Sequence, residues 1–272
     1  MKLGCSSVLF NQLDLYGALQ HIAWAGYEGA ELAILANHCR HIELITDKAY
    51  IDEVKATAKK HGVKLFAIHA DVGYISGEHP VKSVVKLCDV AHKLDIPIIT
   101  MRVKGKSDDK LATEEVFEYI RKLCNEAEKR GVTIAVKPHV GASVYNTATL
   151  VEMLEAIDSP ALGANIDTLH IFRAREDAAV TVKKLGKRLV HVHLREYPDV
   201  ADRQNDEATA EEEIAGRGSV DFPRFFKSLK AAGYEGAMDL DVIGAFTFPL
   251  SKQMGIAAES RGYFNRCLKE LK

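Results

Sequence analysis

Short apolar segments alternate along the chain with longer amphipathic segments. Eight such apolar runs occur, at residues 2–10, 29–35, 64–70, 96–103, 133–140, 162–170, 189–195 and 236–243. Their apolar character is continuous rather than alternating, which is typical of strands that are buried on both faces of a parallel sheet. The pattern therefore predicts eight parallel strands.

Helical patterns fill the intervals between these runs. Four of the predicted helices have an Asp or Thr at the start and a Gly at the end: Asp14–Gly26, Asp47–Gly62, Thr113–Gly131 and Asp221–Gly233. Such residues are common helix caps. Four more helices are predicted at 80–94, 147–157, 174–186 and 249–271. We expect Trp24, in the first helix, to pack against the sheet.

Eight strands, each followed by a helix, is the period of a (β/α)₈ TIM barrel, and 272 residues match the usual length of that fold. Without a Pro- or Ser-rich linker, residues 1–272 are predicted to form one domain. The polar connection at 196–220 is much longer than a usual βα loop of about 2–6 residues. It is either a solvated insertion or an arm over the barrel mouth, where it could join subunits into a homo-oligomer.

Composition narrows the functional classes. Lys and Arg number 36 against 38 Asp and Glu, and the pI is about 6.6, so the basic surface of a nucleic-acid-binding protein is not expected. The five cysteines show no CxxC spacing, which favours reduced thiols. No signal peptide and no long apolar run are recognisable, so we expect a cytoplasmic protein without a membrane segment.

Polar side chains gather at the predicted strand ends, where TIM barrels carry their active sites. They are Glu31, His69, Arg102, Lys137, His139, Asp167, His170, His191, His193, Arg195, Asp239 and Asp241. The pairs at 137/139, 191/193 and 239/241 are two residues apart, so each pair faces one side of its strand. Buried charges need each other or a cation. Imidazole and carboxylate groups suit Zn²⁺, Mn²⁺ or Mg²⁺.

Several motifs together resemble a known family. They are GYEGAEL (26–32), FAIHADVG (66–73), AVKPHVGASVYNT (135–147), GANIDTLH (163–170), HVHLRE (191–196), GRGSVDF (216–222) and GYEGAMDLD (233–241). The chain resembles the xylose isomerase-like, endonuclease IV-like barrels of the sugar phosphate isomerase/epimerase superfamily. The resemblance extends over essentially the whole chain and implies a small sugar or sugar acid as substrate.

The resemblance also implies site residues. In the family, a divalent metal is held by a Glu, an Asp, a His and a Glu on the last four strands. The matching positions are Lys137, Asp167, His193 and Asp241, so a Lys and an Asp stand where the family has Glu. Further positions match the family's substrate pocket or the histidine behind its metal: Glu31, His69, His170 and Arg195.

Lys137 has three interpretations, because an ammonium group has no lone pair and cannot bind a metal. First, the ammonium replaces the metal and pairs with Asp167 and Asp241. Second, a metal persists on His139, Asp167, His193 and Asp241. Third, Lys137 is a base or forms a Schiff base. Charge balance favours the first interpretation.

The resemblance implies an isomerase or epimerase that abstracts a proton next to a carbonyl of a small polyhydroxy ketone or keto acid. Such chemistry requires an electrophile and a base. We expect Lys137 as electrophile, Glu31 or Asp241 as base, and His193 and His170 as hydroxyl ligands. The expected substrate-binding residues are His69, Arg102, His139, His170 and Arg195.

Two alternatives remain open. The same intermediate could lose water or CO₂, which would make the protein a lyase, either a dehydratase or a decarboxylase. Alternatively, the chain could be a non-catalytic sugar-binding member of the family that has lost the metal.

Overall fold

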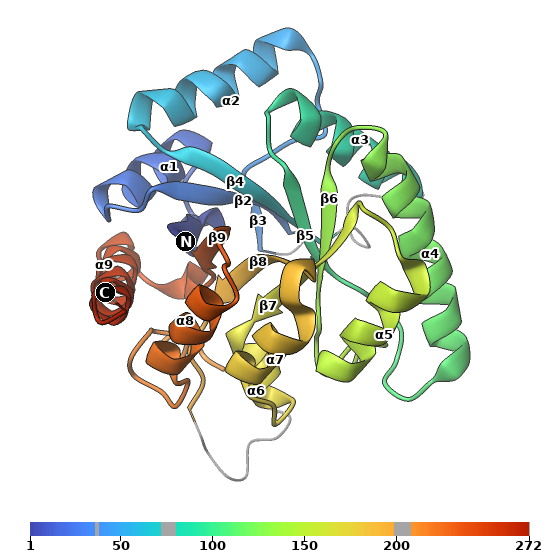
Figure 1. Cartoon of the computed structure of the whole chain (residues 1–272). Coiled ribbons are helices and arrows are strands. Elements are labelled where there is room, and N and C mark those ends of the chain that lie inside the picture. The colour runs from blue at the N-terminus through green and yellow to red at the C-terminus, as the bar shows by residue number, and fades with distance from the viewer. Residues whose placement is uncertain (36–37, 72–79, 199–207, 272) are drawn as a thin grey trace.

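The computed structural model describes residues 1–35, 38–71, 80–198 and 208–271. Eight parallel strands surround the barrel axis (Figure 1): β1 (Lys2–Ser6), β2 (Gly29–Leu35), β4 (Lys64–Ala70), β5 (Ile98–Arg102), β6 (Thr133–Lys137), β7 (Leu162–Asp167), β8 (Leu189–Leu194) and β9 (Ala237–Leu240). The barrel closes because β1 pairs with both β2 and β9. A short antiparallel strand, β3 (Cys39–Arg40), adds to β2. The predicted (β/α)₈ barrel is confirmed.

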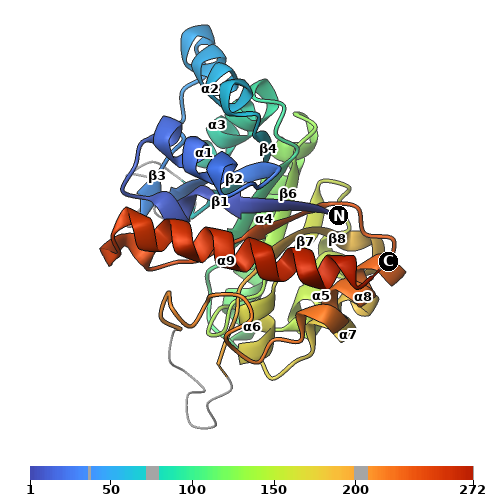
Figure 2. The same cartoon turned by 90° about the vertical axis from the view of Figure 1, so that its left-hand side faces the viewer.

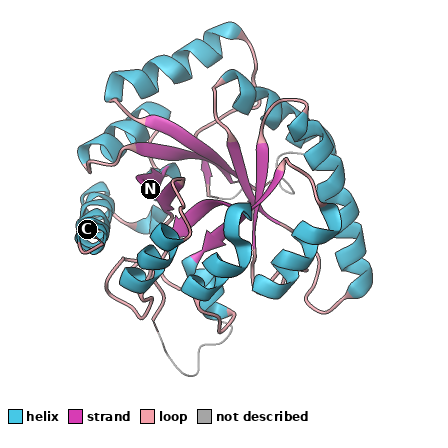
Figure 3. Ribbon diagram, in the orientation of Figure 1, coloured by secondary structure: helices cyan, strands magenta, loops and turns pink. Residues whose placement is uncertain are grey.

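Helices form the outer layer around these strands (Figure 3). They are α1 (Leu15–Trp24), α2 (Lys48–His61), α3 (Pro80–Lys93), α4 (Lys110–Glu128), α5 (Thr147–Ile157), α6 (Thr168–Arg173), α7 (Ala178–Leu185), α8 (Phe222–Ala231) and α9 (Leu250–Lys269). The described residues also form 3₁₀ turns at η1 (Ser7–Phe10), η3 (Gly186–Arg188) and η4 (Ala245–Thr247). In the described part of the chain, no helix is both long and apolar enough to cross a membrane.

Most predicted helix starts are confirmed by side-chain caps. The carboxylates of Asp14, Asp47 and Asp221 each accept a backbone N–H three residues onward, which stabilises a first turn that would otherwise leave donors unpaired. The predicted start at Thr113 is wrong. Helix α4 begins at Lys110, because Asp109 caps it by accepting the N–H of Ala112.

The prediction for Trp24 is also wrong. Helix α1 turns Ala18, Leu19 and Ile22 toward the core, and these three side chains have no exposed surface. Trp24 lies outside this stripe, remains 65% exposed and makes an edge-on contact with the ring of His21. An aromatic residue near a helix end therefore does not indicate the buried face when small apolar residues already define it.

The last helix, α9, lies across the outside of β1 (Figure 2). Its Phe264 packs edge-on against Phe222 and Phe226 of α8, with ring centroids 5.1 and 5.9 Å apart. The hydroxyl of Tyr27, just before β2, donates to the backbone oxygen of Ala257 at 2.9 Å. These contacts hold α9 over the junction of the first and last strands, where closure fixes the positions of the strand ends.

Candidate active site

A cavity of about 690 Å³ opens at the carboxyl ends of the strands. Six of the residues predicted for the site line it: His69, Arg102, Lys137, His139, His170 and Arg195. Apolar side chains, including Leu35, Phe246 and Phe248, and loop residues 208–211 also contribute to the wall. The other predicted residues, Glu31, Asp167, His193 and Asp241, are fully buried beneath the floor of this cavity.

Lys137 lies at the boundary between the cavity and the buried cluster. Its Nζ atom is 3.2 Å from Oδ2 of Asp167, 3.5 Å from Oδ2 of Asp241 and 3.3 Å from Nδ1 of His193. The three partners come from β7, β8 and the end of β9. Strand register explains the convergence, since Asp167 pairs with His193, and His193 pairs with Asp239 two residues before Asp241. The structure therefore brings together the four positions that the family resemblance singled out.

A second group of contacts surrounds Glu31 of β2. Its Oε1 accepts hydrogen bonds from the hydroxyl of Thr100 at 2.6 Å and from Nε2 of His193 at 3.0 Å. Burial acts to raise the pKa of Glu31, but the attraction and hydrogen bond of His193 outweigh it and lower this pKa to about 2. Glu31 is therefore an anion that fixes the His193 ring. Thr100, whose hydroxyl lies within an apolar strand, was not recognised as a site residue from the sequence.

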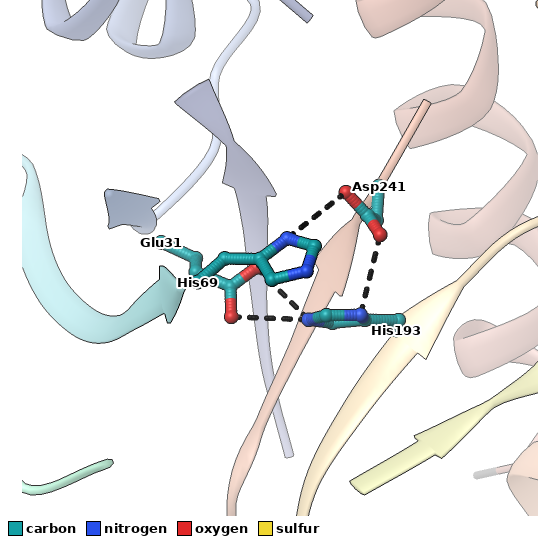
Figure 4. A group of neighbouring side chains, drawn as sticks. All are labelled: Glu31, His69, His193 and Asp241. Atoms are coloured by element: carbon teal, nitrogen blue, oxygen red, sulfur yellow. Dashed lines mark hydrogen bonds and ion pairs between the residues drawn. The ribbon is translucent and has the colours of Figure 1, made fainter. Parts of the chain in front are cut away.

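His193 connects Glu31 to Asp241, since its Nε2 faces Glu31 and its Nδ1 lies 3.2 Å from Oδ2 of Asp241 (Figure 4). Burial favours a neutral ring, but the carboxylates of Glu31 and Asp241 prevail and raise the pKa of His193 to about 9. The ring can therefore carry a proton between two anions at neutral pH. This makes His193 the central proton-holding group under the cavity floor.

His69 reaches this cluster from the cavity side. Its Nδ1 lies 3.9 Å from Oε2 of Glu31 and 3.8 Å from Oδ1 of Asp241 (Figure 4). Burial, reinforced by the charge of Lys137, lowers the pKa of His69 to about 3, so the ring is neutral near pH 7. These three facing atoms are buried and have no hydrogen-bond partner among the described residues. They offer acceptors to a bound group.

His191 and Asp239 form a deeper pair, each two residues before His193 and Asp241 in the chain. Nε2 of His191 is 3.1 Å from Oδ2 of Asp239 and 3.6 Å from Oε1 of Glu31. Burial raises the pKa of Asp239. A Cβ atom at Gly4 would lie 1.8 Å from Oδ1 of Asp239, so the glycine in β1 provides the space for this carboxyl group. The sequence pattern had placed both residues at strand ends without assigning them a role.

Arg195 is held between two carboxylates. Its Nη1 lies 3.3 Å from Oδ2 of Asp167, and its Nη2 forms an ion pair with Glu213. The other oxygen of Glu213 accepts the N–H of Ile243 at 2.8 Å. Burial raises the pKa of Glu213 to about 7 despite the opposing charge of Arg195. Arg195 therefore orients Asp167; because it also lines the cavity, its predicted role in substrate binding stays a prediction.

Glu213 belongs to the long connection at 196–220, of which 199–207 lie outside the described residues. Three glutamates, Glu211–Glu213, are consecutive in its sequence. Glu211 faces the cavity mouth with its side chain 56% exposed, whereas Glu213 is only 1% exposed. The connection therefore contributes a buried residue to the site. Its predicted role in joining subunits stays a prediction.

The start of the same connection explains the GRG motif. The carboxylate of Glu196 accepts the backbone N–H of Gly216 at 3.1 Å and of Val220 at 2.8 Å. A Cβ atom at Gly218 would lie 2.5 Å from the Glu196 side chain, so only glycine allows this close approach. The motif is a folding feature that ties the connection to the end of β8. It forms no phosphate-binding loop.

Arg102 and His139 occupy the rim. Arg102 is partly exposed, and its guanidinium lies 3.3 Å from the carboxylate of Asp71. The ring of His139 lies tilted against that of His170 with ring centroids 4.2 Å apart, and its Nδ1 donates to the backbone oxygen of Val140 at 2.9 Å. The structure therefore does not bring His139 to Asp167, His193 and Asp241 as the second interpretation of Lys137 required.

The neighbouring histidines His139 and His170 make the free energy of unfolding depend on pH. Burial lowers the pKa of His139 to about 4 and holds that of His170 far below its usual value. Between about pH 6.5 and 4 the unfolded chain therefore binds protons that the folded chain excludes. We expect the free energy of unfolding to fall on acidification in this range, by at most ~1.4 kcal/mol per pH unit for each histidine.

Urea unfolding at pH 7, 5.5 and 4.5 measures this slope. The variant His170→Asn is expected to show a shallower loss of stability than the unchanged protein, because one group with a lowered pKa is gone. His92→Asn, which removes an exposed histidine from α3, is the matched control and should leave the slope unaltered. Equal slopes for all three proteins would contradict the assignment.

The class of protein follows from this geometry together with comparison to known sequences. The chain belongs to the xylose isomerase-like TIM barrel family, whose sequence model matches residues 19–267. Inosose dehydratase from Geobacillus thermodenitrificans is 28% identical over 137 residues, a match that spans 46% of each chain. Inosose dehydratase from Lacticaseibacillus casei is 24% identical over 249 residues, covering 80% of this chain and 78% of that protein.

A solved structure shows the same fold. A D-tagatose 3-epimerase-like protein superposes with a TM-score of 0.76 at 19% identity, covering 100% of this chain and 98% of its own. The likenesses thus include proteins named for two reaction types, dehydration and epimerisation. Family membership confirms the resemblance seen in the sequence, and it leaves the reaction of this chain to be argued from its site.

The metal implied by the family can be tested against the residues present. At the four family positions the donor set does not fit, because the Lys137 ammonium points into the space between Asp167, His193 and Asp241. A neighbouring set could hold a metal: donor atoms of Glu31, His69, His193 and Asp241 all lie within 4.8 Å of one another. Asp167 and His139, which were predicted ligands, are outside this second group.

Proposed function

We propose that the protein abstracts a proton next to the carbonyl of a small polyhydroxy ketone or keto acid. The observation that carries this proposal is the meeting of a cation and acid–base groups at the floor of the cavity at the strand ends. Lys137 and His69 line a space of about 690 Å³, and Glu31, His193 and Asp241 lie directly behind them. A cation and a proton acceptor on one face are what enolisation needs.

In this proposal Lys137 and His69 touch the substrate. The Lys137 ammonium donates to the carbonyl oxygen and stabilises the negative charge that develops there. The proton leaves carbon toward His69, whose Nδ1 faces the carboxylates of Glu31 and Asp241. Those carboxylates stabilise the charge that His69 acquires. Glu31, Asp241 and His193, which the sequence suggested as catalytic, act through these two residues because the cavity does not reach them.

The fate of the intermediate decides the reaction class. Return of a proton to the same or a neighbouring carbon gives an isomerase or epimerase, which is our first candidate. Loss of water gives a dehydratase, and the names of the curated relatives favour this second candidate. Both reactions begin with the same proton abstraction, so one experiment tests what they share.

We expect the protein to exchange the hydrogen beside the carbonyl of a keto-sugar for deuterium in D₂O. Proton NMR of a panel containing inososes and ketohexoses reads this exchange, and the products distinguish epimerisation from dehydration. His69→Asn is expected to slow the exchange about 100-fold. His92→Asn, an exposed histidine, is the matched control. Calorimetric binding of a panel member without any exchange would refute the proposal in favour of a sugar-binding protein.

The state of the cysteines bears on the cellular location of the protein. All five cysteines are free and buried, which favours a reducing compartment such as the cytoplasm. A small sugar as the only ligand requires no nucleic acid or membrane partner. These statements stay predictions.

A further inference from the structure

We propose that the ammonium group of Lys137 stands permanently at the position where the xylose isomerase-like family holds a divalent metal, so that this chain needs no metal. The occupancy itself is independent of the proposed function; only its catalytic consequence rests on it.

The contacts of Nζ have the direction expected of such a replacement. An ammonium group has three protons and no acceptor. Nζ lies beside three side chains, 3.2 Å from Oδ2 of Asp167, 3.5 Å from Oδ2 of Asp241 and 3.3 Å from Nδ1 of His193; it donates to the two carboxylates, which leaves one proton for a further acceptor. These three atoms come from three consecutive strands, and each belongs to a side chain at a metal-ligand position of the family. The Lys137 side chain thus stands in place of the family's fourth metal ligand, and its ammonium group makes the contacts that the metal would make.

A metal and the ammonium exclude each other at this point. Zinc and similar ions bind oxygen and nitrogen ligands at about 2.0–2.2 Å. Such an ion, centred among Asp167, His193 and Asp241, would overlap the space taken by Nζ. It would also meet a like charge in a fully buried setting, where such repulsion is strong. Lys137 is itself only 3% exposed, and its Nζ lies between two fully buried carboxylates.

Charge balance points the same way. Asp167 and Asp241 are fully buried, and the Lys137 ammonium lies 3.2 Å from the first and 3.5 Å from the second, with Arg195 also beside Asp167. Removal of the lysine would leave these buried carboxylates without that cation. The ammonium supplies charge that the family draws from a bound ion.

The neighbouring group of Glu31, His69, His193 and Asp241 is the competing location for a metal. Two of its features weigh against it. Nε2 of His193 already bonds Glu31 at 3.0 Å, and an ion there would share Asp241 with the Lys137 ammonium. We therefore assign the carboxylates of this group to the charge that His69 acquires in the proposed reaction. Metal at this location is one of the outcomes that the experiment below separates.

In catalysis, Lys137 therefore supplies a cation that donates a hydrogen bond and that a chelator cannot remove. We expect exchange activity of the unchanged protein to be the same after extensive dialysis against EDTA. A metal-dependent member of the family would lose activity under that treatment.

The test measures Mn²⁺ binding and needs no substrate. The unchanged protein, Lys137→Glu and Lys137→Met are purified, dialysed against EDTA and titrated with Mn²⁺, with free ion followed by electron paramagnetic resonance. We expect no binding by the unchanged protein and one Mn²⁺ per chain in Lys137→Glu. Lys137→Met is the matched control, since it removes the charge without adding a ligand; its affinity should be at least tenfold weaker than that of Lys137→Glu.

Two results would overturn the proposal. One is a stoichiometric metal in the unchanged protein before dialysis, measured by mass spectrometry; its loss in Glu31→Gln would place it in the neighbouring group. The other is a folded Lys137→Glu that binds Mn²⁺ no better than Lys137→Met. If Lys137→Glu does not fold, the metal content of the unchanged protein still decides the question. Absence of sugar exchange, in contrast, would reject only the proposed function.

Discussion

Replacing Arg195 with methionine is expected to lower the free energy of unfolding by about 3–5 kcal/mol, because it removes the cation from between two buried carboxylates. Arg195 and Glu213 are 6% and 1% exposed, and Asp167 is fully buried. After the substitution, Glu213 and Asp167 keep their negative charges or must take up protons. Neither outcome recovers the lost ion pairs. Urea unfolding at pH 7, followed by circular dichroism, measures the difference.

The chain contains a matched control on its surface. Arg217 forms a two-pronged ion pair with Glu259, at 2.7 and 2.6 Å, so its geometry is as good as that of Arg195. Both partners are about half exposed. Solvent screening should limit the cost of Arg217→Met to less than about 1 kcal/mol. Similar losses in the two variants would show that burial of the Arg195 pairs contributes nothing, and would contradict the site described above.

Periodicity in the sequence specifies which residues form strands and which side chains share one face of a strand. Continuous apolar runs predict strands buried on both faces, and a two-residue spacing predicts side chains on one face of a strand. These rules placed twelve polar residues at the strand ends, and the family resemblance singled out Lys137, Asp167, His193 and Asp241 among them. The structure brings the last three within 3.5 Å of Nζ of Lys137. Barrel closure then brings the strand ends to the same level, because hydrogen bonding between neighbouring strands fixes their relative height.

Features of the connections could not be predicted in the same way. Glu213 lies 18 residues from Arg195 in the chain and is indistinguishable by type from its neighbours Glu211 and Glu212. Its burial depends on the path of the 196–220 connection, which no periodic pattern describes. Its fixed points are hydrogen bonds from the backbone to Glu196, and these form only because Gly218 allows a close approach.

The sequence alone likewise could not decide among the three interpretations of Lys137, although charge balance favoured the first. A displacement of a few ångströms separates an ammonium among the acidic groups from one that points aside. Packing decides this, since side chains on the inner face of a barrel have few alternative rotamers. The four-residue group of Glu31, His69, His193 and Asp241 was missed as a set for a related reason. Its members come from β2, β4, β8 and the end of β9, and only barrel closure brings the first two to the last two.

Replacing Lys137 with methionine is expected to reduce the rate of deuterium exchange by about 10²–10³-fold, the usual cost of losing a charged or hydrogen-bonding group that stabilises an oxyanion. The effect should fall on kcat more than on KM, since the ammonium interacts more strongly with the developing negative charge than with the neutral carbonyl. Methionine has a similar length and fills the space that the lysine stem leaves among the strand ends. NMR exchange kinetics at several substrate concentrations separate the two parameters.

Lys252→Met is the matched control for this variant. Lys252, in α9, pairs with the exposed Glu211 near the mouth and does not line the cavity. Its loss removes a positive charge from the same face of the barrel without touching the floor, so exchange should stay within about twofold of the unchanged rate. If Lys137→Met retained exchange at that level, Lys137 would be a counter-ion for Asp167 and Asp241 alone. The electrophile would then have to be sought among the other polar groups that line the cavity, such as Arg102, His139 and His170.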